Sequence, residues 1–224
     1  MAEYDEVNNR LLIKLVFYGP AMSGKTTNLT ALHDLLAPQY KGEMMILETQ
    51  NDRTLFFDLL PLGFQAPSGL LIKLKLFTVP GQVAHDSTRK AVLSRADGIV
   101  FVADSQLNQV FNNAESFQNL EENAGKVGID FTKIPMVVQF NKRDLPQILS
   151  EQEICSRWSA GPWPVTFAQA LNHIGVVETL SILLEMVYQK LDSSHLLLAK
   201  HSLSRKDFVN HIINDIHTVC PSVR

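Results

Sequence analysis

Short, almost continuous apolar runs recur along the chain, and helical patterns separate most of them. Such runs are typical of buried parallel strands, because helices cover both faces of a parallel sheet. Residues 70–79 differ, since Lys73 and Lys75 alternate with apolar residues and predict a strand exposed on one side. The other predicted strands are 11–18, 98–103, 136–140 and 165–168.

The intervening stretches carry apolar residues at helical spacing. In residues 26–36 the side chains of Leu29, Leu32 and Leu36 fall on one side, and Pro38 ends the pattern. Further helical patterns cover residues 113–124, 151–158 and 176–191. Strands that alternate with helices predict an α/β fold, a mainly parallel sheet with helices on both faces.

The last thirty or so residues predict an extra helix. We expect residues 1–192 to form one domain and 193–224 to form a linker and an amphipathic helix. Ser204 and Asp207 have the spacing of a capping box. An apolar arc follows that is too large to remain in water: Phe208, Val209, Ile212, Ile213, Ile216, Val219 and Cys220. We expect this face to dock on its own domain; a partner or a second copy is the alternative.

Composition narrows the choice of partners. The 224 residues carry a formal net charge of −3, so no global basic field favours nucleic acid. The start of the chain is acidic and polar, Ala2 excludes myristoylation, and Cys220 stands one place too early for prenylation. Neither cysteine belongs to a CxxC motif. We therefore expect a cytosolic protein without a membrane anchor of its own.

A phosphate-binding loop follows the first long strand. The segment Gly19-Pro20-Ala21-Met22-Ser23-Gly24-Lys25-Thr26 fits the pattern GxxxxGK[ST], between a strand and a helix as the mechanism requires. Successive backbone N–H groups of such a loop face phosphate at the helix N-terminus. Lys25 would contact the β- and γ-phosphates, and the Thr26 hydroxyl would bind Mg²⁺. The predicted nucleotide-binding residues here are Gly19, Ala21, Met22, Ser23, Gly24, Lys25, Thr26 and Thr27.

A second motif indicates which base is bound. Asn141-Lys142-Arg143-Asp144 follows the predicted strand 136–140, at the sheet edge where α/β proteins place ligands. A carboxylate at Asp144 can accept hydrogen bonds from guanine N1–H and its 2-amino group, which adenine does not offer in that position. Asn141 can bond N7, and the Lys142 stem can lie over the base. The N–H of Ala168 is the predicted donor to guanine O6.

With both motifs present, the chain resembles the Ras-like GTPases and, more narrowly, the bacterial MglA family of cell-polarity and gliding-motility GTPases. The likeness covers about residues 11–191. It is carried by Gly42-Glu43-Met44, Arg53-Thr54-Leu55-Phe56-Phe57-Asp58, Thr78-Val79-Pro80-Gly81-Gln82, the strand 98–103 with Asp104-Ser105, and Asn141-Lys142-Arg143-Asp144-Leu145-Pro146. The resemblance implies a cytosolic polarity switch, recruited to a cell pole by partners, with a Roadblock-type dimeric activating protein and an effector that the sequence does not identify.

The resemblance also implies roles for the switch segments. Thr54 is similar to the threonine that ligates Mg²⁺ and senses the γ-phosphate. Gln82 is similar to the glutamine that orients the attacking water, and Gly81 to the glycine whose N–H meets the γ-phosphate. Arg53 is either an arginine finger supplied in cis or a surface arginine. The predicted catalytic residues are thus Gln82, Arg53, Lys25 and Thr54, and the predicted metal ligands are Thr26 and Thr54.

Two positions raise the possibility of slow turnover. Thr78 stands where most Ras-like proteins have the aspartate of DxxG, and a hydroxyl holds Mg²⁺ through water more weakly than a carboxylate does. Ala21 adds a methyl group near the γ-phosphate. We therefore expect a switch that binds GTP or GDP with Mg²⁺ and hydrolyses GTP slowly. The alternatives are a nucleotide-binding scaffold with little turnover and a phosphotransferase, and the guanine motif counts against the phosphotransferase.

Overall fold

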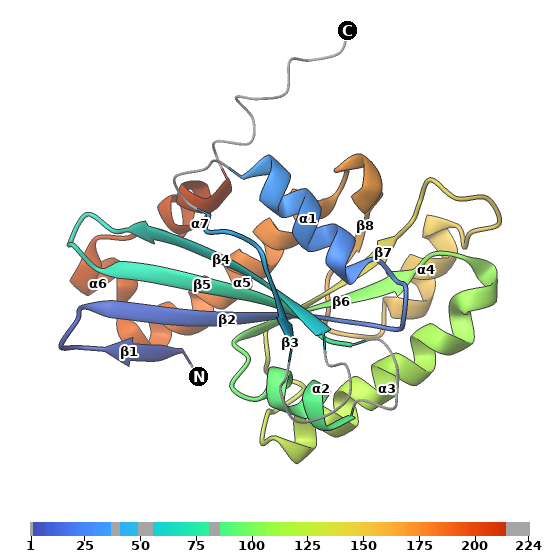
Figure 1. Cartoon of the computed structure of the whole chain (residues 1–224), viewed down its shortest axis with the longest axis horizontal. Helices are drawn as coiled ribbons and strands as arrows, with labels where there is room; N and C mark the ends of the chain where they lie inside the picture. Colours follow the sequence, from blue (N-terminus) through green and yellow to red (C-terminus); the bar gives the residue numbers. More distant parts are fainter. Residues whose placement is uncertain (1, 37–40, 49–55, 81–85, 214–224) are drawn as a thin grey trace, which may run out of the picture.

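A central sheet organises the protein (Figure 1). The computed structural model describes residues 2–36, 41–48, 56–80 and 86–213. In this part of the chain the sheet has eight strands, ordered β3-β4-β5-β2-β6-β7-β8, with β1 paired to β2. The strands are β1 (Glu3–Asp5), β2 (Arg10–Tyr18), β3 (Met45–Glu48), β4 (Phe56–Gln65), β5 (Leu71–Thr78), β6 (Gly98–Asp104), β7 (Met136–Asn141) and β8 (Val165–Phe167).

Helices cover both faces of this sheet. They are α1 (Lys25–Leu35), α2 (Asp86–Leu93), α3 (Val110–Lys126), α4 (Glu151–Trp158), α5 (Val176–His195), α6 (Leu197–His201) and α7 (Arg205–Ile213). Helices α1, α5 and α7 bury one core with alternate strand positions such as Ile13 and Leu15 of β2. Helices α2, α3 and α4 bury the other core with Val16 and Tyr18 of the same strand. This alternation places apolar side chains on both faces of β2, as predicted from its almost unbroken apolar run.

The prediction of a mainly parallel sheet is confirmed. Strand β2 pairs in parallel with β5 and β6, and β7 pairs in parallel with β6 and β8. Strands β1, β3 and β4 are antiparallel to their neighbours. The sequence pattern missed β3 and β4. Pro61 and Gly63 lie inside β4 and are unfavourable in strands, so pairing with β5 rather than local preference makes this segment extended.

The C-terminal helix α7 docks on the domain that precedes it, as its apolar arc predicted. Phe208, Val209, Ile212 and Ile213 are buried against α5 and β4. The predicted helix start is also present, since the Ser204 Oγ accepts a 3.1 Å hydrogen bond from the Asp207 N–H. Ile216, Val219 and Cys220 lie outside the described residues. Among the described helices, none is long and apolar enough to cross a membrane.

Candidate functional site

The phosphate loop connects β2 to α1 and depends on glycine for its shape. Gly24 has φ +98°, a left-handed conformation that favours glycine. A Cβ atom at this position would lie 2.2 Å from the Asn141 Nδ2, so a side chain would displace the Asn141 amide group. Gly19 has φ +149°, and its Cβ would lie 2.2 Å from the Val102 carbonyl oxygen. The two glycines therefore let the loop pass close to β6 and to the end of β7.

The loop encloses a cation that has no acidic hydrogen-bond partner among the described residues. The Lys25 ammonium donates to the carbonyl oxygens of Gly19 (3.0 Å) and Pro20 (2.7 Å). Burial, with a smaller contribution from the nearby Arg89 charge, lowers the pKa of Lys25 to about 7. Among the residues that the structure describes, the buried Ser23 Oγ has no hydrogen-bond partner. A buried ammonium and an unsatisfied hydroxyl at a helix N-terminus fit a phosphate group, which would supply the missing negative charge.

A carboxylate that sequence reasoning missed lies next to the predicted magnesium ligand Thr26. The Thr26 hydroxyl donates a 2.6 Å hydrogen bond to the Asp58 Oδ2. The Thr78 hydroxyl donates to the same oxygen at 3.0 Å and accepts a 2.9 Å hydrogen bond from the Asp58 N–H. Asp58 belongs to β4 and Thr78 to the adjacent β5. The neighbouring strand thus brings a carboxylate to the place where Thr78 replaces the aspartate of DxxG.

A pocket of about 250 Å³ joins the phosphate loop to the guanine motif. The Asn141 Nδ2 donates a 3.0 Å hydrogen bond to the Ser23 carbonyl oxygen, across 118 residues of sequence. The Asn141 Oδ1 accepts one from the Ala170 N–H at 2.9 Å. The Asn141 side chain therefore connects the guanine motif to the phosphate loop and to the segment that contains Ala170. The pocket is lined by Met22, Gly24, Thr27, Asn141, Lys142, Asp144, Leu145, Ala170 and Leu171.

Two of the three charged residues of the guanine motif, Lys142 and Asp144, line this pocket. The Lys142 ammonium pairs with the buried Asp104 carboxylate at 2.7 Å, which fixes the position of the lysine stem at the pocket wall. Lys142 also adopts φ +65°, an unusual backbone conformation for a lysine. Asp144 is exposed and lines the pocket. An exposed carboxylate beside a restrained lysine stem is what the predicted contacts with a purine require.

The structure does not support the prediction that Ala168 contacts the base. Its N–H donates a 2.9 Å hydrogen bond to the Phe140 carbonyl oxygen, and the residue is buried. This hydrogen bond extends the β7–β8 pairing by one residue, so the Ala168 N–H is already bonded within the sheet. Ala170 and Leu171 form the pocket wall instead.

A network of hydrogen bonds between buried polar side chains connects the elements that form the pocket. The Gln139 Nε2 donates to the Asn28 Oδ1 at 2.9 Å and to the Thr179 Oγ1 at 3.0 Å. The Asn28 Nδ2 donates in turn to the Gly24 carbonyl oxygen at 2.9 Å. All three side chains are buried. The network connects the phosphate loop, α5 and the strand that ends in Asn141.

The structure brings together most of the predicted site residues. Lys25, Thr26 and Ser23 occupy the loop, and Met22 and Thr27 line the pocket of about 250 Å³ described above, which is the candidate base pocket. Ala21 is exposed. Arg53, Thr54, Gly81 and Gln82 lie outside the described residues.

Asp58 carried a signal in the sequence that the motif search did not use. It is an acid within the apolar run from Leu55 to Leu60. Because a buried charge is costly without partners, a lone acid in such a run indicates a specific role. The roles of Ala170 and Gln139 had no comparable signal.

A phosphate loop at the C-terminal edge of a mainly parallel sheet, with a base pocket beside it, defines a P-loop nucleotide-binding protein of the Ras-like class. Residues 62–187 match the ADP-ribosylation factor (Arf) family. The chain is also 43% identical over 178 residues to the mutual gliding-motility protein MglA of Myxococcus xanthus (strain DK1622). That similarity covers 80% of this chain and 91% of the relative. The chain therefore belongs to the MglA family of Ras-like small GTPases.

Proposed function

We propose that this protein is a guanine-nucleotide switch that binds GTP and GDP with Mg²⁺, hydrolyses GTP slowly and acts through partners that recognise its GTP state. The main support is the hydrogen bond from the Asn141 amide to the Ser23 carbonyl, which makes the phosphate loop and the guanine motif two walls of one pocket. A ligand that has both a base and phosphates matches these two walls.

Each half of the ligand would meet a different kind of group. Asp144 would accept hydrogen bonds from guanine, and Lys142 would cover the face of the base. Lys25 would bind the β- and γ-phosphates, and the loop N–H groups would surround them. Thr26 and Thr54 would hold Mg²⁺, which would supply positive charge to these phosphates. Asp58 would orient the Thr26 hydroxyl by accepting its hydrogen bond.

Hydrolysis requires groups from the switch segments. Gln82 would orient the attacking water, and Arg53 would stabilise negative charge on the transferring phosphoryl group. Single-turnover GTP hydrolysis tests this assignment. We expect Gln82→Leu to bind GTP normally and to lose most of its turnover. If Arg53 is the finger, Arg53→Ala should reduce the partner-stimulated rate about a hundredfold or more. An unchanged stimulated rate would leave Arg53 as a surface residue.

The alternative function is a nucleotide-binding scaffold with little turnover. The observation that favours it is Ala21, which adds a methyl group to a loop that must approach the γ-phosphate. The same single-turnover assay decides between the two functions. We expect Ala21→Gly to hydrolyse GTP faster than the wild type, which itself turns over measurably. A wild type without turnover, alone and with an activator, would favour the scaffold.

The cellular role rests on the family resemblance. We propose that the switch regulates cell polarity or motility, that a Roadblock-type dimeric protein stimulates its hydrolysis, and that partners recruit it to a cell pole. Mixing the GTP-loaded and GDP-loaded protein with such an activator would test this role. We expect binding and stimulation of hydrolysis with the GTP form, and much weaker binding with the GDP form.

A further inference from the structure

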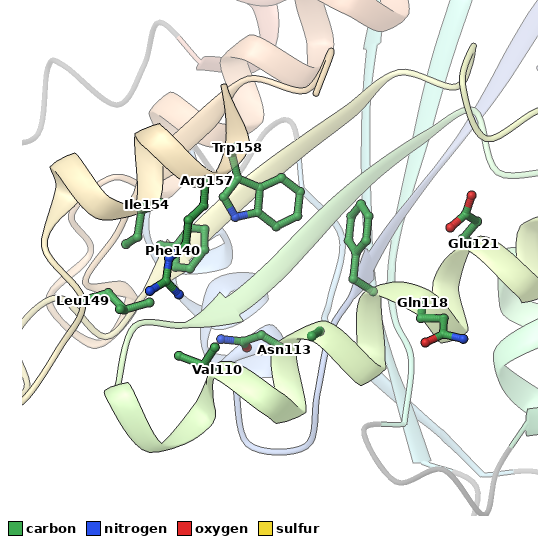
Figure 2. Close-up of a pocket in the computed structure, with 11 residues that line it drawn as sticks. Val110, Asn113, Gln118, Glu121, Phe140, Leu149, Ile154, Arg157 and Trp158 are labelled. Carbon is green, nitrogen blue, oxygen red and sulfur yellow. The ribbon is translucent and has the colours of Figure 1, made fainter. Parts of the chain in front are cut away.

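A second cavity, of about 320 Å³, lies between α3 and α4, away from the base pocket (Figure 2). Its walls are mostly apolar and come from three parts of the chain: α3, the end of β7, and the segment from Leu149 through α4. The residues that line it are Val110, Asn113, Ala114, Phe117, Gln118, Glu121, Phe140, Leu149, Ile154, Arg157 and Trp158.

The cavity has the size and composition of a site for a small ligand. Sites of this kind have volumes of roughly 300–1,000 Å³ and apolar walls with a few polar groups. Here the aromatic rings of Phe117 and Trp158 pack edge to face with centroids 4.9 Å apart. Phe140 and Trp158 pack similarly at 6.3 Å. Rings that contact one another in this way form firm walls, so the cavity suits a compact apolar group.

Two charged residues line this cavity, the cation Arg157 and the acid Glu121, and Figure 2 shows them at opposite ends of it. Arg157 lines it from α4, and Figure 2 shows its side chain extending toward the α3 side. In the part of the chain that the structure describes, its guanidinium makes no hydrogen bond. Glu153, one turn earlier, accepts hydrogen bonds from the Ser150 hydroxyl (2.8 Å) and N–H (3.0 Å), which together with the weaker attraction of Arg157 lower the pKa of its carboxyl group. A guanidinium beside apolar walls binds a carboxylate well, because it can donate two parallel hydrogen bonds.

The cavity also touches residues that position the guanine motif. The Asn113 Oδ1 accepts a 2.9 Å hydrogen bond from the Asp104 N–H, and its Nδ2 donates to the Asp104 carbonyl at 2.8 Å. Asp104 in turn holds the Lys142 ammonium. Phe140 directly precedes Asn141 in β7. An occupant would therefore contact two residues that restrain the base pocket.

We propose that the α3–α4 cavity is a regulatory site for a compact apolar carboxylate, which pairs with Arg157 and tightens the binding of guanine nucleotide. Tightening is the expected direction because an occupant restrains Asn113 and Phe140, so that the base pocket loses less freedom when the nucleotide binds. Binding in the cavity is independent of the proposed function, whereas the effect on nucleotide rests on it.

Octanoate is a suitable probe for the first half of the proposal. The intrinsic fluorescence of the full-length, GDP-loaded protein reports on the cavity, because Trp158 lines it. We expect saturable binding of octanoate, weaker binding of octan-1-ol, and still weaker binding of octylammonium. Arg157→Gln should weaken octanoate about tenfold and leave octan-1-ol unchanged. Ala114→Phe, which adds a ring at an exposed position of the lining, should weaken all three ligands.

Lys126→Gln, at the end of α3 and outside the cavity, is the matched control and should bind octanoate like the wild type. Thermal melts of the three variants should match the wild type, because all three side chains are exposed. If Ala114→Phe melts early, Ala114→Leu replaces it. Non-saturable fluorescence changes, equal affinities for octanoate and octan-1-ol, or octanoate binding that survives Arg157→Gln would overturn the proposal.

Release of GDP tests the second half. Saturating octanoate should slow GDP release about fivefold or more in the wild type and have no effect in Ala114→Phe. By linkage, GDP should strengthen octanoate binding by the factor by which octanoate strengthens GDP binding. Saturable octanoate binding with unchanged GDP affinity and release would overturn the coupling alone. A protein that binds octanoate but no guanine nucleotide would contradict the proposed function and leave the cavity assignment standing.

Discussion

Among single residues, Asp58 gives the most direct test of the magnesium site. Its carboxylate accepts hydrogen bonds from Thr26 and Thr78, so it orients the hydroxyl that would bind the metal. We expect Asp58→Asn to weaken Mg²⁺ binding in the GDP complex by about 10–100-fold, as removal of outer-shell partners typically does. A magnesium titration of GDP release measures this change.

Asp130→Asn is the matched control, because Asp130 is an exposed acid beyond the end of α3. Magnesium dependence should be unchanged in this variant. If Asp58→Asn also has wild-type magnesium dependence, Asp58 has only a structural role between β4 and β5. The weak metal binding expected from Thr78 alone would then stand.

We expect Asp144 to decide which base the pocket accepts. It is exposed and lines the pocket beside Lys142, with room to receive hydrogen bonds from a base. We expect Asp144→Asn to lose guanine nucleotides and to gain xanthine nucleotides, because the asparagine amide donates where the carboxylate accepted. The loss for GDP should be on the order of a thousandfold or more, since sites built around hydrogen bonds reject mismatched ligands strongly. Competition binding with GDP, XDP and ADP measures the change; comparable wild-type affinities for GTP and ATP would contradict the guanine assignment.

At the scale of elements, we expect α7 to add stability to the domain it covers. Phe208 packs against Phe64 of β4 and Tyr188 of α5, with ring centroids 5.9 and 5.5 Å away. The Tyr188 hydroxyl also donates a 2.8 Å hydrogen bond to the Leu203 carbonyl. Each buried apolar side chain of this size contributes roughly 1.5–3 kcal/mol before the entropy cost of ordering the helix.

We expect a chain that ends at Leu198 to melt about 5 °C or more below the full-length protein, since 1 kcal/mol shifts the Tm of a domain this size by about 2–4 °C. Its GDP affinity should stay within about threefold of wild type. The reason is distance: Phe64 lies six positions along β4 from Asp58, about 20 Å in an extended strand.

A chain that ends at Ile213 is the matched control for this truncation, because it keeps the whole of α7. It should melt close to the full-length protein. If the Leu198 truncation melts unchanged and loses only a binding partner, α7 is a docking arm for that partner. A large loss of GDP affinity would instead mean that α7 holds β4, and with it Asp58, in place.

At the scale of the whole molecule, the candidate nucleotide pocket brings together parts of the chain that are far apart in sequence. The loop near Ser23, the motif near Asn141 and the wall at Ala170 meet at one pocket. A ligand that binds only this folded arrangement stabilises it by about 2.7 kcal/mol at a hundredfold excess over its Kd.

We therefore expect GDP with Mg²⁺ at that excess to raise the Tm of nucleotide-free protein by about 5–10 °C. ADP at the same concentration should raise it by less than about 1 °C. Removal of Mg²⁺ with EDTA should reverse part of the GDP effect, because the metal contributes to binding. Scanning calorimetry measures all three shifts, and equal shifts with ADP and GDP would contradict a guanine-selective pocket.

Local patterns in the sequence determined the phosphate loop, the guanine motif, the parallel strands and the C-terminal helix. In each case the physical cause of the local structure lies in residues that are close together in the sequence. Gly24 must adopt a left-handed conformation next to Lys25, and β6 is apolar from Gly98 to Ala103 because both of its faces are covered. Ser204 caps the helix whose apolar side chains follow it in sequence. Such causes act within a few residues, so they can be recognised from the sequence.

Only the tertiary structure decided what depends on neighbours distant in sequence. Segment 56–65 is a strand because β5 supplies hydrogen bonds that outweigh Pro61 and Gly63. That pairing brings Asp58 to Thr78 and to the phosphate loop, 32 residues away from Thr26. The N–H of Ala168 is bonded to β7 within the sheet, and Ala170 lines the pocket in its place. The α3–α4 cavity likewise exists because α3 and α4 pack into one core without closing the space between them, which no local pattern encodes.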